Sequence, residues 1–271
     1  MSDRWAPPPY RVPEGPGTGE YARAHRRFTE DALDDPGLRE RLRTGAPLPA
    51  GYGIGLDERV VEWPWIAAHA AGGPALDAGS TLNHAHVLDR VLDRLAPLHV
   101  ATLRPEGHAF TEHGVSYVYA DLRDLPLRDA RFATVVCAST LEHVGMDNSL
   151  YGGPADRAPD PDAEVARAIS ELHRVTAPGG VALVTVPFGR AEDFGWFRQI
   201  DGPTLERWIA ASGASGSEVE VFAYGPDGWQ RTDPAAAAGA RYHDHRAAGG
   251  AAPDGAAAAR AVACVRLVWE F

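Results

Sequence analysis

The stretch VSYVYADLRDLPLRDARFATVVCASTLEHVG at 115–145, continued by LHRVTAPGGVALVTVPFG at 172–189, decides the fold. It contains three apolar runs, at 115–119, 132–138 and 181–186, which are rich in β-branched residues and do not alternate with polar ones. Runs of this kind are typical of strands that are buried on both faces of a parallel sheet. The sequence therefore predicts an α/β domain.

A helix is predicted between the second and the third of these strands. Its apolar residues Val165, Ile169, Leu172 and Val175 keep helical spacing, and Pro-Gly-Gly at 178–180 is a stop signal. A strand, a crossover helix and a strand form a βαβ unit, and such units place ligands at the carboxyl ends of their strands. The polar residues that follow the predicted strands at these ends are Asp121, Ser139, Thr140 and His143.

The segment at 74–189 resembles the class I S-adenosylmethionine-dependent methyltransferases, in the small-molecule branch that includes the quinone methylases. In that family an acidic residue and a Leu-Pro pair precede the fourth strand, and a Pro-Gly-Gly turn enters the fifth, as in ADLRDLPL and APGG here. The resemblance implies S-adenosylmethionine as the cofactor. It also implies a doubly wound, mostly parallel, seven-stranded Rossmann-like sheet with helices on both faces and an antiparallel last strand.

The same resemblance assigns the cofactor site. The turn after the strand at 74–79 would hold the methionine portion, but the usual acidic-x-Gly-x-Gly-x-Gly pattern reads Asp77-Ala-Gly79-Ser-Thr81-Leu-Asn83 here, so only the first glycine is kept. Asp121 and Leu122 would meet the adenine. The residues expected to bind the cofactor are Asp77, Gly79, Ser80, Thr81, Asn83, Leu103, Glu106, Asp121, Leu122 and Ser139.

The strand at 99–103 lacks the carboxylate that the family commonly uses for the ribose hydroxyls. Leu103 and Arg104 stand in that neighbourhood, and Glu106 is the nearest acid. Either Glu106 reaches back to the ribose, or backbone groups and water hold it.

Methyl transfer from a sulfonium needs a base only if the acceptor must lose a proton. His143 is the first choice for that base, and the alternative is a structural residue that fixes its loop. Asp147 is the second catalytic candidate. It lies in a polar insert at 145–162 whose acids could hold a divalent cation or form a hydrated loop, and no metal is assigned.

Aromatic and basic residues in two further loops are expected to form the acceptor pocket, together with one residue of the insert. The substrate-binding candidates are Tyr151, Trp196, Arg198, Tyr242 and His243. The strands at 218–224 and 261–271 are expected to be joined by a long connection, rich in Ala and Gly, at 235–260.

We expect two parts in the chain: an N-terminal tail and cap helices at 1–72, and a methyltransferase-like domain at 73–271 with insertions at 145–162 and 235–260. The stretch at 1–19 is rich in Pro and Gly, which predicts disorder. The helices that follow it either cover the cofactor or pack on the edge of the sheet.

The composition restricts the partners. A formal net charge of −11 argues against nucleic acid and anionic membrane surfaces, which favour positive charge. Cys137 and Cys264 lie in apolar runs, as buried thiols do in a reducing compartment, and no apolar stretch could span a bilayer. We therefore predict a cytoplasmic protein that acts on a small molecule. A homodimer is a possible assembly.

The leading hypothesis is a methyltransferase that acts on a small polar metabolite, at a hydroxyl of a sugar or a natural product. Whether oxygen, nitrogen or carbon is methylated stays open. One alternative is a methyltransferase-like fold retained as a binding or regulatory subunit, because Thr81, Asn83 and Leu103 stand where the family has other chemistry. The other is a non-methylating enzyme on the same fold, such as an isomerase or a cyclase.

Overall fold

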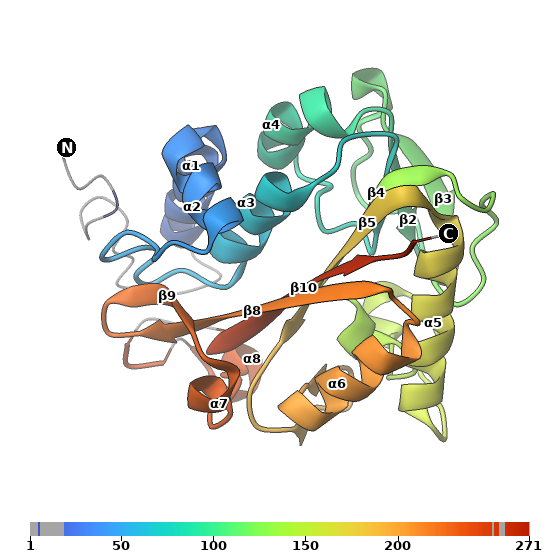
Figure 1. Cartoon of the computed structure of the whole chain (residues 1–271). Helices are drawn as coiled ribbons and strands as arrows, with labels where there is room; N and C mark the ends of the chain where they lie inside the picture. The colour runs from blue at the N-terminus through green and yellow to red at the C-terminus, as the bar shows by residue number, and fades with distance from the viewer. Residues whose placement is uncertain (1–4, 6–18, 251, 255–257, 271) are drawn as a thin grey trace.

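The computed structural model describes residues 5, 19–250, 252–254 and 258–270 (Figure 1). The helices are α1 (Gly19–Asp34), α2 (Pro36–Thr44), α3 (Arg59–His69), α4 (Ala85–Leu95), α5 (Pro161–Val175), α6 (Gly202–Ala211), α7 (Pro234–Ala237) and α8 (His245–Ala248), with 3₁₀ turns η1 (Thr111–His113), η2 (Leu141–His143) and η3 (Ser149–Tyr151). The strands are β1 (Ala75–Ala78), β2 (Leu98–Thr102), β3 (Ser116–Tyr119), β4 (Phe132–Ala138), β5 (Thr176–Pro187), β6 (Glu192–Asp193), β7 (Arg198–Gln199), β8 (Gly216–Gly225), β9 (Gly228–Thr232) and β10 (Ala261–Val268).

The main sheet has eight strands in the order β3-β2-β1-β4-β5-β10-β8-β9. The first five are parallel, while β10 runs antiparallel to both β5 and β8. The predicted doubly wound sheet with an antiparallel last strand is therefore confirmed. Because β1 pairs with β2 on one side and with β4 on the other, the chain changes direction there, and the carboxyl ends of these strands flank a crevice.

The predicted number of seven strands is wrong, because β9 forms a hairpin with β8. Pro226 and Asp227 make the tight turn between Gly225 and Gly228, which are paired across it. The buried indole of Trp229 in β9 then anchors the hairpin. Its backbone N–H donates to the Tyr52 carbonyl at 2.8 Å and its Nε1–H donates to the Leu56 carbonyl at 3.0 Å.

Helices cover both faces of the sheet, as predicted (Figure 1). The buried apolar residues of α1 to α4 belong to one core cluster, which includes Phe28 and Val87. Those of α5 and α6 belong to a second cluster on the opposite face, which includes Ile169 and Trp208. Helix α5 has the predicted apolar positions buried because their spacing places them on one stripe of the helix.

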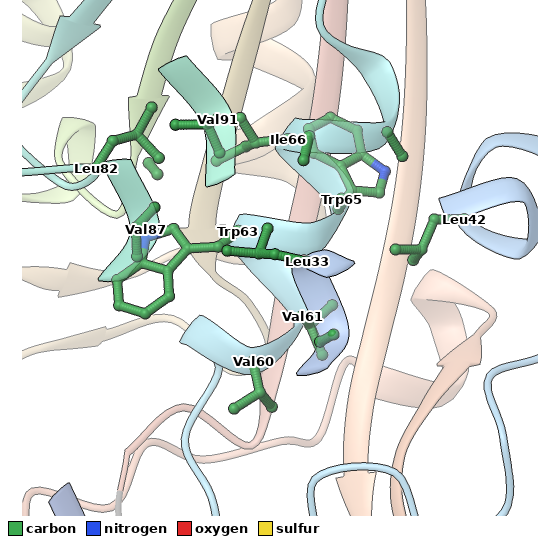
Figure 2. Close-up of a cluster of buried hydrophobic side chains, with 14 of the residues drawn as sticks. Leu33, Leu42, Val60, Val61, Trp63, Trp65, Ile66, Leu82, Val87 and Val91 are labelled. Carbon is green, nitrogen blue, oxygen red and sulfur yellow. The ribbon is translucent and has the colours of Figure 1, made fainter. Parts of the chain in front are cut away.

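Helix α3 is buried along most of its length, and every residue from Val60 to Ala68 is inaccessible or nearly so. Figure 2 shows Ile66 directed toward Val91 of α4, and Trp63 directed toward Val87. The Nε1–H of Trp63 also donates to the Thr81 carbonyl at 3.1 Å. This helix therefore fixes the loop that follows β1 as well as the packing of α1 and α4.

The prediction of disorder at 1–19 falls on residues outside those that the structure describes, apart from Trp5 and Gly19, the first residue of α1. Within the described part of the chain, every helix is too short or too polar to cross a bilayer.

We predict that Ile66→Ala lowers the free energy of unfolding by about 2–5 kcal/mol, because Ile66 is fully buried and its removal leaves a cavity between α3 and α4. Leu150→Ala, at a side chain that is 59% exposed, is the control and should change this free energy by less than about 0.5 kcal/mol. Urea denaturation measures both. Equal midpoints for the two variants would contradict the packing described here.

Candidate active site

A cavity of about 370 Å³ opens at the carboxyl ends of β1, β2, β3 and β4. Its volume falls in the range of roughly 300–1,000 Å³ that is common for small-molecule sites. The structure brings many of the predicted site residues together there. Those that line the cavity are Gly79, Ser80, Thr81, Leu103, Glu106, Asp121, Leu122, Ser139, His143 and Tyr151.

The loop after β1 is held from below by Asp77. This carboxylate is fully buried and accepts the backbone N–H groups of Thr81 at 3.1 Å and Leu82 at 2.7 Å. Burial raises its pKa to about 7. Asp77 is thus placed under the loop and is not among the residues that line the cavity.

Gly79 allows β1 to pass close to the loop after β4. Its φ is +127°, and an added Cβ would lie 2.1 Å from the Thr140 hydroxyl oxygen. Both the backbone conformation and the lack of space therefore require glycine here.

The two residues that replace the later glycines make side-chain hydrogen bonds to the protein. Thr81 Oγ1 donates to the Ala138 carbonyl at 2.7 Å. Asn83 Nδ2 donates to Glu106 at 2.9 Å, and its Oδ1 accepts from the Tyr117 hydroxyl at 2.8 Å. Neither residue has a positive φ, so the loop keeps its course without the glycines. Asn83 consequently lies behind Glu106 and outside the cavity wall.

Ser80 is the strained residue of this loop, with a φ of 63°. Its buried hydroxyl lines the cavity and has no hydrogen-bond partner among the described residues. A buried hydroxyl without a partner is costly, so a polar group of a ligand would stabilise this arrangement.

Two carboxylates face the cavity from the loops after β2 and β3. Glu106 is fixed by Asn83, whereas Asp121 accepts from Arg123 Nε at 2.9 Å and Nη2 at 2.6 Å. Burial alone would raise the pKa of Asp121, but the hydrogen bonds and charge of Arg123 outweigh it and hold that pKa below its usual value. Asp121 is therefore ionised at neutral pH.

His143 lies in η2 after β4, enclosed by aromatic rings. Its centroid is 5.2 Å from that of Trp196 and 5.3 Å from that of Tyr151. Nδ1 lies 2.9 Å from the Trp196 carbonyl, which can only accept, so Nδ1 carries the proton and Nε2 the lone pair. Burial lowers the pKa to about 4. The imidazole is therefore neutral at physiological pH.

The other predicted residues do not line the cavity. Asp147 accepts the Ser149 N–H at 2.9 Å and closes the turn at η3. Trp196 reaches the site through His143. Arg198 forms an ion pair with Asp162 at 2.9 Å and stacks over Trp208.

The two candidates from the Ala/Gly-rich connection are also separate from the cavity wall. Tyr242 packs on Phe197 at a centroid distance of 4.7 Å, behind Trp196. His243 Nε2 lies 2.8 Å from the Gly250 carbonyl. Within the described residues, no three His, Cys, Asp or Glu side chains are grouped so as to hold a metal ion.

Arg59 is the main lining residue that the sequence reasoning missed. It contacts Glu62, which is fully buried and also accepts from the Ser139 hydroxyl at 2.7 Å and the Thr185 hydroxyl at 2.6 Å. The sequence signal that could have pointed to Arg59 and its partner is Glu62 itself. A carboxylate inside an otherwise apolar helix is rare unless it is paired.

Comparison with known proteins adds a family match. Residues 94–184 match the family model described as a methyltransferase domain. No curated protein matches the sequence.

Two similar solved structures were crystallised with S-adenosylhomocysteine. The 1,6-didemethyltoxoflavin-N1-methyltransferase of Burkholderia thailandensis is 12% identical, with 72% of this chain and 71% of that chain covered at a TM-score of 0.43. The N-methyltransferase NodS of Bradyrhizobium japonicum is 14% identical, with 90% and 97% covered at 0.45.

The family match falls on the segment from the end of α4 to β5, which contributes β2, β3 and β4 to the rim of the cavity. The match covers less than half of the chain and shows a methyltransferase-domain segment at 94–184, which lies within a Rossmann-like sheet of mostly parallel strands.

Proposed function

We propose that the protein transfers the methyl group of S-adenosylmethionine to a hydroxyl of a small polar metabolite, such as a sugar or a natural product. The observation that carries this proposal is that one cavity is lined both by the loop residues Gly79 and Ser80 and by His143. A donor site and a base therefore share one enclosed space.

The residues along the cavity fit the parts of the cofactor. The Gly79 loop, whose Ser80 hydroxyl has no hydrogen-bond partner in the described part of the chain, suits the methionine end. Glu106 suits the ribose hydroxyls, because a carboxylate can accept from both. The ionised Asp121 suits the amino group of the adenine, and the apolar Leu122 beside it suits the ring.

When bound, S-adenosylmethionine would supply an electrophilic methyl group, which the acceptor oxygen would take by in-line displacement with S-adenosylhomocysteine as the leaving group. The role of the chain is then to hold the acceptor and to take its proton. Nε2 of His143 carries the lone pair, and the Glu142 carboxyl, 4.0 Å away, is too far to form a hydrogen bond with it. A hydroxyl that donates to Nε2 would become more nucleophilic as its proton is transferred.

The surroundings of His143 favour a small acceptor. Its ring is enclosed by Tyr151 and Trp196, and Asn148 adds a polar group to the same wall. We also propose that the N-terminal helices at 19–69 close this crevice as cap helices, since Arg59 at the start of α3 lines it.

We predict that Glu106→Gln weakens the binding of S-adenosylhomocysteine about tenfold to a hundredfold, because a charge-assisted hydrogen bond to the ribose is lost. Glu112→Gln is the matched control, since Glu112 is 65% exposed and does not line the cavity. Titration calorimetry measures both dissociation constants. An unchanged affinity in Glu106→Gln would remove this residue from the ribose site.

We predict that His143→Gln lowers kcat by about 10²–10⁴ and leaves the affinity for S-adenosylhomocysteine unchanged, because only proton transfer is lost. In the wild type, kcat/KM should be constant above about pH 5 and fall as the pH drops toward 4, where the imidazole becomes protonated.

Transfer of labelled methyl to an acceptor, found by screening small-molecule extracts of the source cell, measures this rate. His113→Gln, at a 39% exposed side chain outside the cavity, is the control. Full turnover by His143→Gln would show that His143 is not the base.

A further inference from the structure

Arg59 brings a cation to the wall of the cavity that the loop after β1 also lines. It lines the cavity together with Gly79, Ser80 and His84. It is the first residue of α3, and it lies outside the segment at 94–184 that the methyltransferase family model matches. Arg59 is thus a feature of this chain and not of the matched family segment.

The Arg59 side chain is held in place by a fixed counter-charge. Its Nη1 contacts Glu62, and the Glu62 carboxylate is in turn bonded to the hydroxyls of Ser139 and Thr185 at the ends of β4 and β5. A guanidinium that is anchored before a ligand arrives loses little conformational freedom on binding it.

Two other carboxyl groups close to Arg59 do not compete strongly for it. Burial raises the pKa of Glu58 to about 8, so this group is mostly neutral near pH 7. Asp57 is engaged by the Tyr21 hydroxyl at 2.7 Å and by His25 Nε2 at 2.9 Å. Glu62 therefore remains as the main counter-charge of Arg59.

The guanidinium has donors to spare. It presents five N–H groups in a planar fork, and the contact with Glu62 uses Nη1. Such a fork matches the two oxygens of a carboxylate better than any other side chain does.

We propose that Arg59 binds the carboxylate of the methionine end of the cofactor, and that Glu62 is the positioning residue that orients Arg59 for it. This inference rests on the proposed function, which places that end of the cofactor at the Gly79 loop. It implies that an N-terminal helix completes the donor site.

The test compares two ligands on the wild type and on Arg59→Gln/Glu62→Gln. The ligands are S-adenosylhomocysteine and its decarboxylated analogue, which keeps the amine, the thioether and the adenosine. The double change avoids an unpaired buried carboxylate, and Gln at 62 can still accept from Ser139 and Thr185. We expect the affinity for S-adenosylhomocysteine to fall about tenfold to a hundredfold and that for the analogue to change less than about threefold.

Two further variants sharpen the result. Glu62→Gln alone should lower the affinity for S-adenosylhomocysteine and leave the affinity for the analogue unchanged, because Arg59 keeps its charge but loses the carboxylate that orients it. Arg43→Gln/Glu40→Gln removes an exposed Arg–Glu pair on α2 and should change neither affinity.

Each other outcome overturns the inference. Equal weakening of both ligands would assign Arg59 and Glu62 a structural role, and unchanged affinities would place the carboxylate elsewhere. If the wild type binds neither ligand, the proposed cofactor site itself fails. Because the analogue retains the adenosine end, its binding also reports whether each variant is folded.

Discussion

The buried carboxylate of Glu62 is the constraint on which the site depends. It accepts from hydroxyls at the ends of β4 and β5 and contacts Arg59, so one group joins a helix of the N-terminal region to two central strands. A carboxylate can be fully buried only when such partners replace water. The same bonds hold Ser139 at a φ of 41°, in the loop that leads to His143. Helix packing and the geometry of the candidate active site are therefore linked through one side chain.

The loop after β1 keeps its geometry although two of the three glycines expected for a methyltransferase site are replaced. Gly79 is kept where an added Cβ would collide with Thr140. Thr81 and Asn83 occupy ordinary backbone conformations and direct their side chains to the Ala138 carbonyl and to Glu106. The side-chain hydrogen bonds of Thr81 and Asn83 thus hold the loop in its course, at positions where the family pattern has glycines.

Much of the fold could be predicted from the sequence, because the buried strands and the amphipathic α5 are local patterns. The same patterns place Asp121, Ser139 and His143 at strand ends, and the structure brings them to one cavity. β9 was missed because its support comes from Tyr52 and Leu56, far away in the sequence.

The roles of individual side chains were harder to predict. The pairing of Glu62 with Ser139 and Thr185 spans 77 and 123 residues, and no local pattern reports a contact of that range. Arg198 is of a residue type that is common in binding pockets. Its guanidinium, however, pairs with Asp162 and stacks over Trp208, so it does not face the cavity. Composition indicates which residues could serve a site, and only the tertiary contacts decide which of them do.

The eighth strand has a consequence for how the molecule unfolds. Trp229 ties the far edge of the sheet to the segment around Tyr52 and Leu56, which leads into α3, while Trp63 ties α3 to the loop after β1. The segment that leads into α3 is thus hydrogen-bonded to the edge of the sheet, and α3 itself to the loop at its centre. We expect them to melt together with the strands in one cooperative transition, since neither part can open without breaking contacts of the other.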